Sequence, residues 1–127
     1  MLRKPALFIL LFVLISSNLS GQQKDESGIY LICEKMPEVV GGLAAIGKKL
    51  EYPKIAKMMK VQGVVYVGFI VTKEGTVKEP KILKPLEESC NKEALRVVGK
   101  LKFIPGYHQG VAVPVRFVLP IRFVLSR

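Results

Sequence analysis

The chain has 127 residues, of which 20 are basic and 10 acidic, and its formal net charge is +10. This length allows one domain with a small core. The lysines are spread along the sequence without interleaved aromatic residues, so we interpret them as a solvated basic surface and expect no nucleic-acid partner. An anionic partner or a membrane surface is the alternative interpretation.

Residues 1–21 have the three parts of a secretory signal peptide. Arg3 and Lys4 are basic, an apolar run covers Ala6 to Ile15, and small residues follow up to Gly21. The apolar run is shorter than the roughly 20 residues that span a bilayer. We therefore predict that this segment is cleaved after export, and an uncleaved inner-membrane anchor is the alternative.

A polar tail with a short strand is predicted over residues 22–36, loosely attached at its start. Two short helices follow. The first has Leu43, Ile46 and Leu50 at helical spacing. Pro53 interrupts this pattern, because a residue before proline avoids the α region, and it suits the first turn of a second helix. The second helix extends to residue 60, and we expect its inward side chains to be Ile55, Ala56 and Met59.

Residues 62–83 predict a β-hairpin, around which the rest of the chain is organised. Valine and phenylalanine alternate along its first strand, and Gly75 lies in the connecting loop, where a positive φ is often required. Pro80 lies in the more polar second strand. Because proline cannot donate to a ladder, we predict an edge strand or a bulge there.

A helix over residues 91–100 and a long strand over residues 111–125 complete the predicted fold. Ser89 or Asn91 is the expected N-cap of the helix, and residues 107–110 are expected to form a loop. Along the strand, apolar side chains fall on one face, while the other carries Arg116 and Arg122 and also two prolines. The predicted core consists of Val65, Val67, Phe69, Leu95, Val98, Phe117 and Leu119.

This order of elements predicts an α+β fold with two layers, in which helices cover the hairpin and a third strand. The last strand is expected to be an edge strand, because the hairpin needs only one further neighbour. Unpaired backbone groups along such an edge are a template for a partner strand. A strand-swapped homodimer is an alternative to a monomer.

From Pro37 onward the sequence resembles the TonB C-terminal domain family, and its start resembles a subgroup common in Bacteroidetes. The resemblance gives a domain over residues 37–127. The matching motifs are Met36-Pro37-Glu38, Gly41-Gly42, Tyr52-Pro53 with Ala56, Gly63-Val64-Val65, Phe69-Ile70-Val71, Gly75-Thr76-Val77, residues 90–98, Phe103-Ile104-Pro105-Gly106, Gly110, Val113-Pro114-Val115 and residues 119–123.

The resemblance implies a three-stranded antiparallel sheet packed against helices. It also implies a periplasmic module that docks on an outer-membrane TonB-dependent transporter or another envelope protein. In the family, a short "box" peptide of the transporter pairs with the exposed last strand. The alternative is a membrane-anchored energy transducer for transport across the outer membrane, with membrane contact only if the N-terminal segment is uncleaved. About 15 residues separate the N-terminal segment 1–21 from Pro37, and they reach roughly 50 Å when extended, which favours the first interpretation.

Two sets of residues are the predicted partner site. Tyr52 and Pro53 are carried over from the family's motif, although they also have a structural interpretation as a helix boundary. The second set lies along the last strand and follows from its expected position at the edge of the sheet. In the alternative interpretation, the two arginines of this set are solvated and contact no partner. The predicted partner-binding residues are Tyr52, Pro53, Val115, Arg116, Phe117, Val118, Leu119 and Arg122.

Catalytic chemistry is hard to build from this sequence, and we expect no enzyme, no cofactor and no metal. The chain has one histidine, His108, and one aspartate, Asp25, which lies in the polar tail. Cys33 and Cys90 have no metal-ligand spacing with His108. In an oxidising compartment these two cysteines are a candidate disulfide, with two buried thiols as the alternative.

Overall fold

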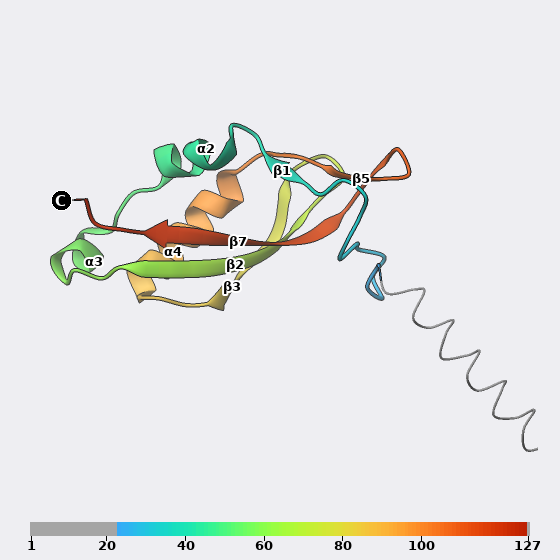
Figure 1. The fold of residues 1–127 in the computed structure, drawn as a ribbon. Coiled ribbons are helices and arrows are strands. Elements are labelled where there is room, and N and C mark those ends of the chain that lie inside the picture. The colour runs from blue at the N-terminus through green and yellow to red at the C-terminus, as the bar shows by residue number, and fades with distance from the viewer. Residues whose placement is uncertain (1–22, 127) are drawn as a thin grey trace, which may run out of the picture.

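A three-stranded antiparallel sheet forms the centre of the fold in a computed structural model that describes residues 23–126 (Figure 1). Its strand order is β3-β2-β7, so β2 is central. The predicted signal peptide, residues 1–21, lies outside the described residues. The three strands are β2 (Gly63–Val71), β3 (Val77–Lys84) and β7 (Val115–Phe123). The α+β prediction is confirmed.

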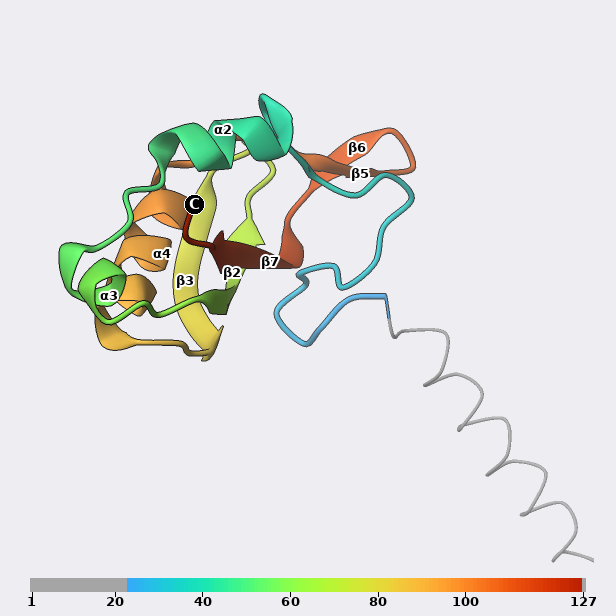
Figure 2. The same cartoon turned by 60° about the vertical axis from the view of Figure 1, so that its left-hand side comes forward.

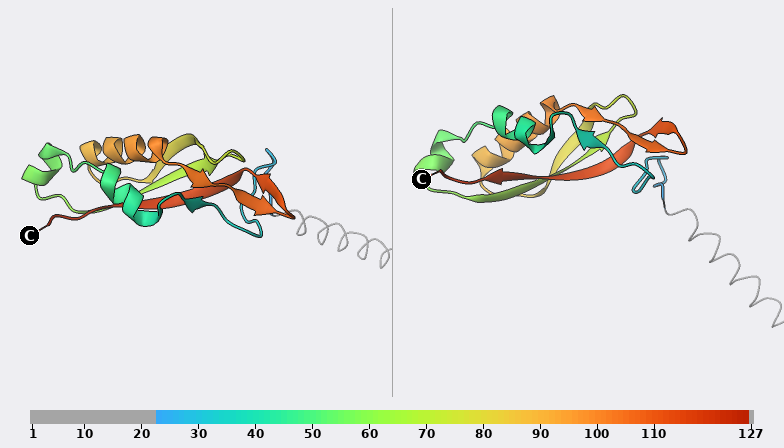
Figure 3. Two further views of the ribbon diagram at one scale, coloured as in Figure 1. Left: turned by 90° about the horizontal axis from the view of Figure 1, so that it is seen from above. Right: turned by 45° about the horizontal axis from the view of Figure 1, so that its top comes forward.

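The helices and short strands surround this sheet. Helix α4 (Glu88–Lys100) lies against one face of the sheet, where it contacts β2 and β3 (Figure 2). Helix α2 lies beyond the outer edge of β7, on the side away from β2 (Figures 1 and 3). The other elements are β1 (Glu38–Val39), α2 (Gly42–Lys49), α3 (Lys54–Met58), β4 (Phe103–Ile104), β5 (Gly106–His108) and β6 (Val111–Val113).

Strand β7 pairs with β2 without interruption, from Gly63 opposite Phe123 to Val71 opposite Val115. The β2–β3 pairing is less regular, with register shifts on either side of Gly68. Beside Pro80, Glu79 has a φ of 53°, a value uncommon for a residue other than glycine. The prediction that this strand is an irregular edge strand is therefore confirmed.

The alternating residues of β2 and β7 form the core, as predicted. Val65, Val67 and Ile121 are completely buried under the helices, and Phe69 is 4% exposed. All seven predicted core residues belong to one cluster, although Leu95 and Phe117 are only partly buried in it. This alternation leaves the even-numbered side chains of β7 on the open face of the sheet.

The N-terminus of α4 differs from the prediction. The helix begins at Glu88, and its N-cap is Glu87, whose carboxylate accepts hydrogen bonds from the amides of Ser89 and Cys90 at 3.0 and 3.3 Å. The Ser89 hydroxyl also donates to this carboxylate, and its hydrogen bond, together with those of the amides, holds the pKa of Glu87 below its usual value. Ser89 and Asn91 were therefore the wrong caps, because both lie inside the first helical turn.

The two short helices bury less than their spacing predicts. Leu43 in α2 is 77% exposed, while Ile46 is buried. In α3 only Ala56 is buried, and Ile55 and Met59 are 60% and 64% exposed, so their predicted inward orientation is wrong. The physical reason is that α3 has five residues and lies at the end of the sheet, where it has little surface to cover.

The predicted long strand is divided at Pro114. Strand β6 precedes this proline and pairs with β5, and β7 follows it. Residues 107–110 are therefore part of a second hairpin, whose turn residues Gln109 and Gly110 have φ values of 52° and 78°. Positive φ at both central positions is the geometry of a tight hairpin turn.

Candidate functional site

The outer edge of β7 has no strand neighbour in the three-stranded sheet. The amide of Arg116 donates a 2.9 Å hydrogen bond away from β2, to the carbonyl oxygen of Tyr30. Because backbone groups alternate between the two sides of a strand, those of Val118, Pro120 and Arg122 also point outward. The outward amides of Val118 and Arg122 and the carbonyl oxygens between them therefore form a hydrogen-bonding edge.

The predicted partner-binding residues of β7 divide into two groups. Val118 is 53% exposed, and the side chains of Arg116 and Arg122 are also exposed. Val115 and Leu119, by contrast, are buried, and Phe117 is half-buried. The backbone groups of this second group point toward β2. Only the even-numbered residues therefore present both side chains and backbone groups at the free surface.

The chain's own polar tail occupies the start of this edge. Tyr30 donates its amide to the carbonyl oxygen of Pro114 at 2.9 Å and accepts from the amide of Arg116, so it forms a parallel bridge beside Val115. This attachment contradicts the prediction of a loosely attached tail. The short strand predicted within residues 22–36 contributes only this one bridge to β7.

Asp25 fixes the tail a second time. One carboxylate oxygen lies 2.7 Å from Nε of Arg116, and the other accepts the amides of Ser27 and Ile29. The hydrogen bond from Arg116 holds the pKa of the Asp25 carboxyl below its usual value. Arg116 is therefore already paired within the chain. The sequence Asp25-Glu26-Ser27-Gly28 signals the local turn, but it carries no signal for the distant arginine.

Tyr52 lies at the opposite end of β7. Its ring meets the ring of Phe123 edge-on with centroids 5.7 Å apart, and its hydroxyl donates to the carbonyl oxygen of Val61. Tyr52 and Pro53 are both half-buried. These contacts give Tyr52 a packing role, which joins the segment between α2 and α3 to the end of the sheet.

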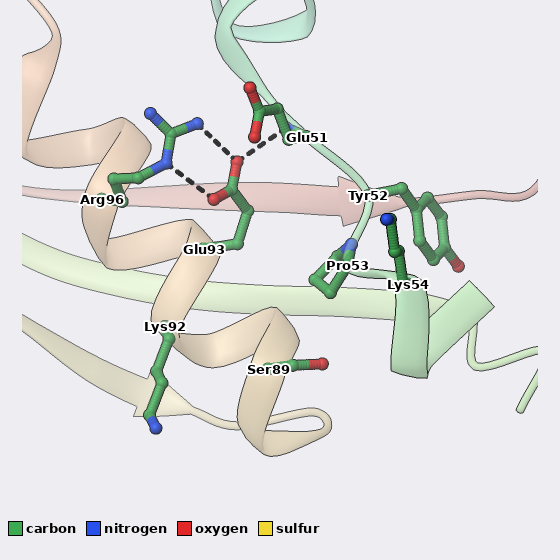
Figure 4. Close-up of a pocket in the computed structure, with 8 residues that line it drawn as sticks. All are labelled: Glu51, Tyr52, Pro53, Lys54, Ser89, Lys92, Glu93 and Arg96. Atoms are coloured by element: carbon green, nitrogen blue, oxygen red, sulfur yellow. Dashed lines mark hydrogen bonds and ion pairs between the residues drawn. The ribbon is translucent and has the colours of Figure 1, made fainter. Parts of the chain in front are cut away.

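A cavity of about 420 Å³ lies beside Tyr52 and Pro53, and two of its charged groups, Glu93 and Arg96, bond to each other (Figure 4). The buried carboxylate of Glu93 accepts from Arg96 at 2.7 Å and from the amide of Glu51 at 2.6 Å. The hydrogen bonds from Arg96 hold the pKa of Glu93 below its usual value. This arrangement clamps the α2–α3 connection to α4.

Catalytic and metal-binding groups do not converge in the described part of the chain. Residues 23–126 contain no cluster of histidine, cysteine, aspartate or glutamate suited to a metal ion. His108, which was expected in a loop, instead ends β5 and is partly buried, with Nδ1 3.3 Å from the amide of Glu34 and its ring 5.0 Å from that of Tyr30. Within the same residues, no helix is long and apolar enough to cross a membrane.

The two cysteines are buried, free thiols. Cys33 packs with Val113 and Val115 near the tail, whereas Cys90 belongs to α4 and packs in the main core. The candidate disulfide is therefore not formed in this structure, since the two side chains belong to different clusters. Burial raises the pKa of both thiols.

Comparisons with known proteins agree on one family. A family model described as "Gram-negative bacterial TonB protein C-terminal" matches residues 48–125. A comparison with curated proteins found no match. Two solved structures of the Helicobacter pylori TonB C-terminal domain, covering residues 179–285 and 194–285 of that protein, are each 26% identical to this chain.

These two structures each cover 66% of this chain, the chain covers 77% and 89% of them respectively, and the TM-scores are 0.51 and 0.53. The TonB C-terminal domain is a periplasmic, non-enzymatic module for interaction and energy transduction, which in TonB proteins interacts with outer-membrane transporters. The prediction that this protein is not an enzyme is therefore confirmed by its family. The chain belongs to the TonB C-terminal domain family.

Proposed function

We propose that this protein is a periplasmic docking module that binds an extended segment of an outer-membrane TonB-dependent transporter, or of another envelope protein, at the outer edge of β7. The observation that carries this proposal is a strand with one neighbour whose Arg116 amide donates away from β2, since strand alternation then directs the Val118 and Arg122 amides the same way. An added strand gains affinity from main-chain hydrogen bonds and specificity from side-chain pockets.

The edge is also limited in a way that suits one short partner. The backbone of Tyr30 is already hydrogen-bonded to the carbonyl oxygen of Pro114 and to the amide of Arg116, and Pro120 has no amide hydrogen to donate. An unprotected long edge would invite open-ended association between copies of the chain. The remaining stretch, from the Arg116 carbonyl to Arg122, supports a partner segment of about six residues at the usual rise of a strand.

The experiment uses Val118→Pro, which removes the central outward amide and leaves the inward ladder to β2 in place. The control is Val118→Thr, which keeps the amide and the branched shape of the side chain. The probes are synthetic peptides from the amino-terminal periplasmic segments of TonB-dependent transporters encoded by the same genome. We expect Val118→Pro to weaken binding at least about tenfold, or 1.4 kcal/mol, and Val118→Thr to bind as the wild type does.

Circular dichroism checks that both variants are folded. Wild-type affinity in folded Val118→Pro contradicts strand addition at this edge. If Val118→Pro does not fold, hydrogen exchange of the Val118 amide in the wild-type chain tests the same hydrogen bond to the peptide. In that case, an unchanged exchange rate on peptide addition contradicts the proposal.

A further inference from the structure

A small apolar groove lies between α2 and the C-terminal end of β7. Its volume is about 200 Å³, and its lining residues are Leu43, Ile46, Gly47, Leu50, Pro120 and Arg122. The groove is directly next to the stretch of edge at which we propose a partner strand to add. Five of the six lining residues are apolar, so the groove suits an aliphatic side chain better than a polar one.

Two features of α2 leave room for a partner side chain beside this groove. Leu43 exposes 77% of its surface beside this groove, although it lies on the same helix as the buried Ile46. A Cβ added at Gly47 meets no atom within 4 Å, so the space above this glycine is open. An exposed leucine beside an open glycine gives a partner side chain an apolar wall and room to approach.

The charge at this end of the edge is also unbalanced. Arg122 is exposed on the open face, and none of the ion pairs found among residues 23–126 involves it. Arg116 on the same face has such a partner within the chain. Asp25 belongs to the tail, which pairs with the edge of β7 at Tyr30, and its carboxylate lies 2.7 Å from Nε of Arg116. A segment bound further along β7 meets Arg122 on the same face.

We propose that the partner segment is a short extended peptide with alternating chemistry, in which an aliphatic side chain fills the α2 groove and a carboxylate pairs with Arg122. This inference rests on the proposed docking at the edge of β7, and it names the side chains that the edge selects. The alternation follows from strand geometry, since successive side chains point to opposite faces. The tail at Tyr30 sets the limit of the segment at the other end.

The probe is a capped, fluorescein-labelled heptapeptide of alternating valine and glutamate, titrated with the full mature chain by fluorescence polarisation at low salt. One comparison peptide has serine in place of valine, and a second has glutamine in place of glutamate. We expect each replacement to weaken binding to the wild type at least about tenfold, because one loses the groove contact and the other loses the ion pair.

Two matched pairs of variants test the groove and the arginine separately. Gly47→Phe fills the groove, whereas Gly47→Ala adds only a methyl group in open space. We expect Gly47→Phe to lose at least about tenfold in affinity and Gly47→Ala to keep it. Arg122→Gln should remove the preference for glutamate over glutamine, and Arg122→Lys should keep most of it, because it retains the charge.

The outcomes separate this inference from the proposed function. If Val118→Pro abolishes binding of the valine–glutamate peptide while Gly47→Phe and Arg122→Gln bind it normally, docking at the edge stands and the groove inference is wrong. If Val118→Pro binds normally, the proposed docking itself is wrong. Equal affinity for the valine and serine peptides, or no binding up to about 1 mM, also overturns the inference.

Discussion

Replacing Phe69 with alanine tests the packing of the sheet against the helices. The Phe69 side chain is 4% exposed, and its ring centroid lies 5.5 Å from that of Phe103 and 5.8 Å from that of Phe117. Truncating a buried phenylalanine to alanine costs about 3–5 kcal/mol, to which two aromatic contacts of about 0.5–1.5 kcal/mol each contribute. This loss is a large part of the about 5–15 kcal/mol that stabilises a typical domain.

The assay is urea unfolding followed by far-ultraviolet circular dichroism. With a slope of about 2 kcal/mol per molar urea, the expected midpoint falls by about 2 M. Leu43→Ala is the control, because that side chain is 77% exposed and its loss should change the free energy of unfolding by less than about 0.5 kcal/mol. A change below about 1 kcal/mol for Phe69→Ala would refute the assignment of the inner face.

Three further predictions concern the tail, a buried carboxylate and the thiols. Tyr30→Pro removes the amide that attaches the tail, so the Arg116 amide should exchange with solvent faster, and an unchanged rate would contradict the observed bridge. Glu93→Gln should cost about 1–3 kcal/mol at neutral pH. Because the folded pKa of Glu93 is lowered, this difference should shrink as the pH falls below about 4.5, and a constant difference would contradict it. Cys33 and Cys90 should resist iodoacetamide in the native chain and both react in urea without reductant, whereas no reaction in urea would indicate a bridge.

Local patterns predicted the sheet and its faces because the signal lies within each strand. The alternation from Val65 to Val71 and the apolar residues of β7 fix which face packs against the helices, and the structure follows both, although Ile70 on the opposite face of β2 is also buried. The break at Pro114 was harder to predict, because the apolar alternation continues across it. The chain turns there since residues before the proline pair with β5 instead of β2.

The features that sequence reasoning missed depend on contacts between distant residues. Nothing within α3 shows that the sheet ends beneath it, so helical spacing predicted that Ile55 points inward. In the same way, Asp25 and Arg116 are 91 positions apart in the sequence, and their pairing depends on the tail returning to β7. The N-cap was missed for a local reason, because the Glu87 side chain competes with the serine and asparagine that follow it.

Hydrogen exchange along β7 tests the central claim of docking at the free edge most directly. Exchange of backbone amides is measured by nuclear magnetic resonance with and without a transporter-derived peptide. We predict that the Val118 and Arg122 amides become protected on binding, while those of Phe117 and Leu119, which face β2, are protected in both states. Unchanged exchange at Val118 and Arg122 when the peptide is bound, with new protection elsewhere in the chain, would contradict the claim.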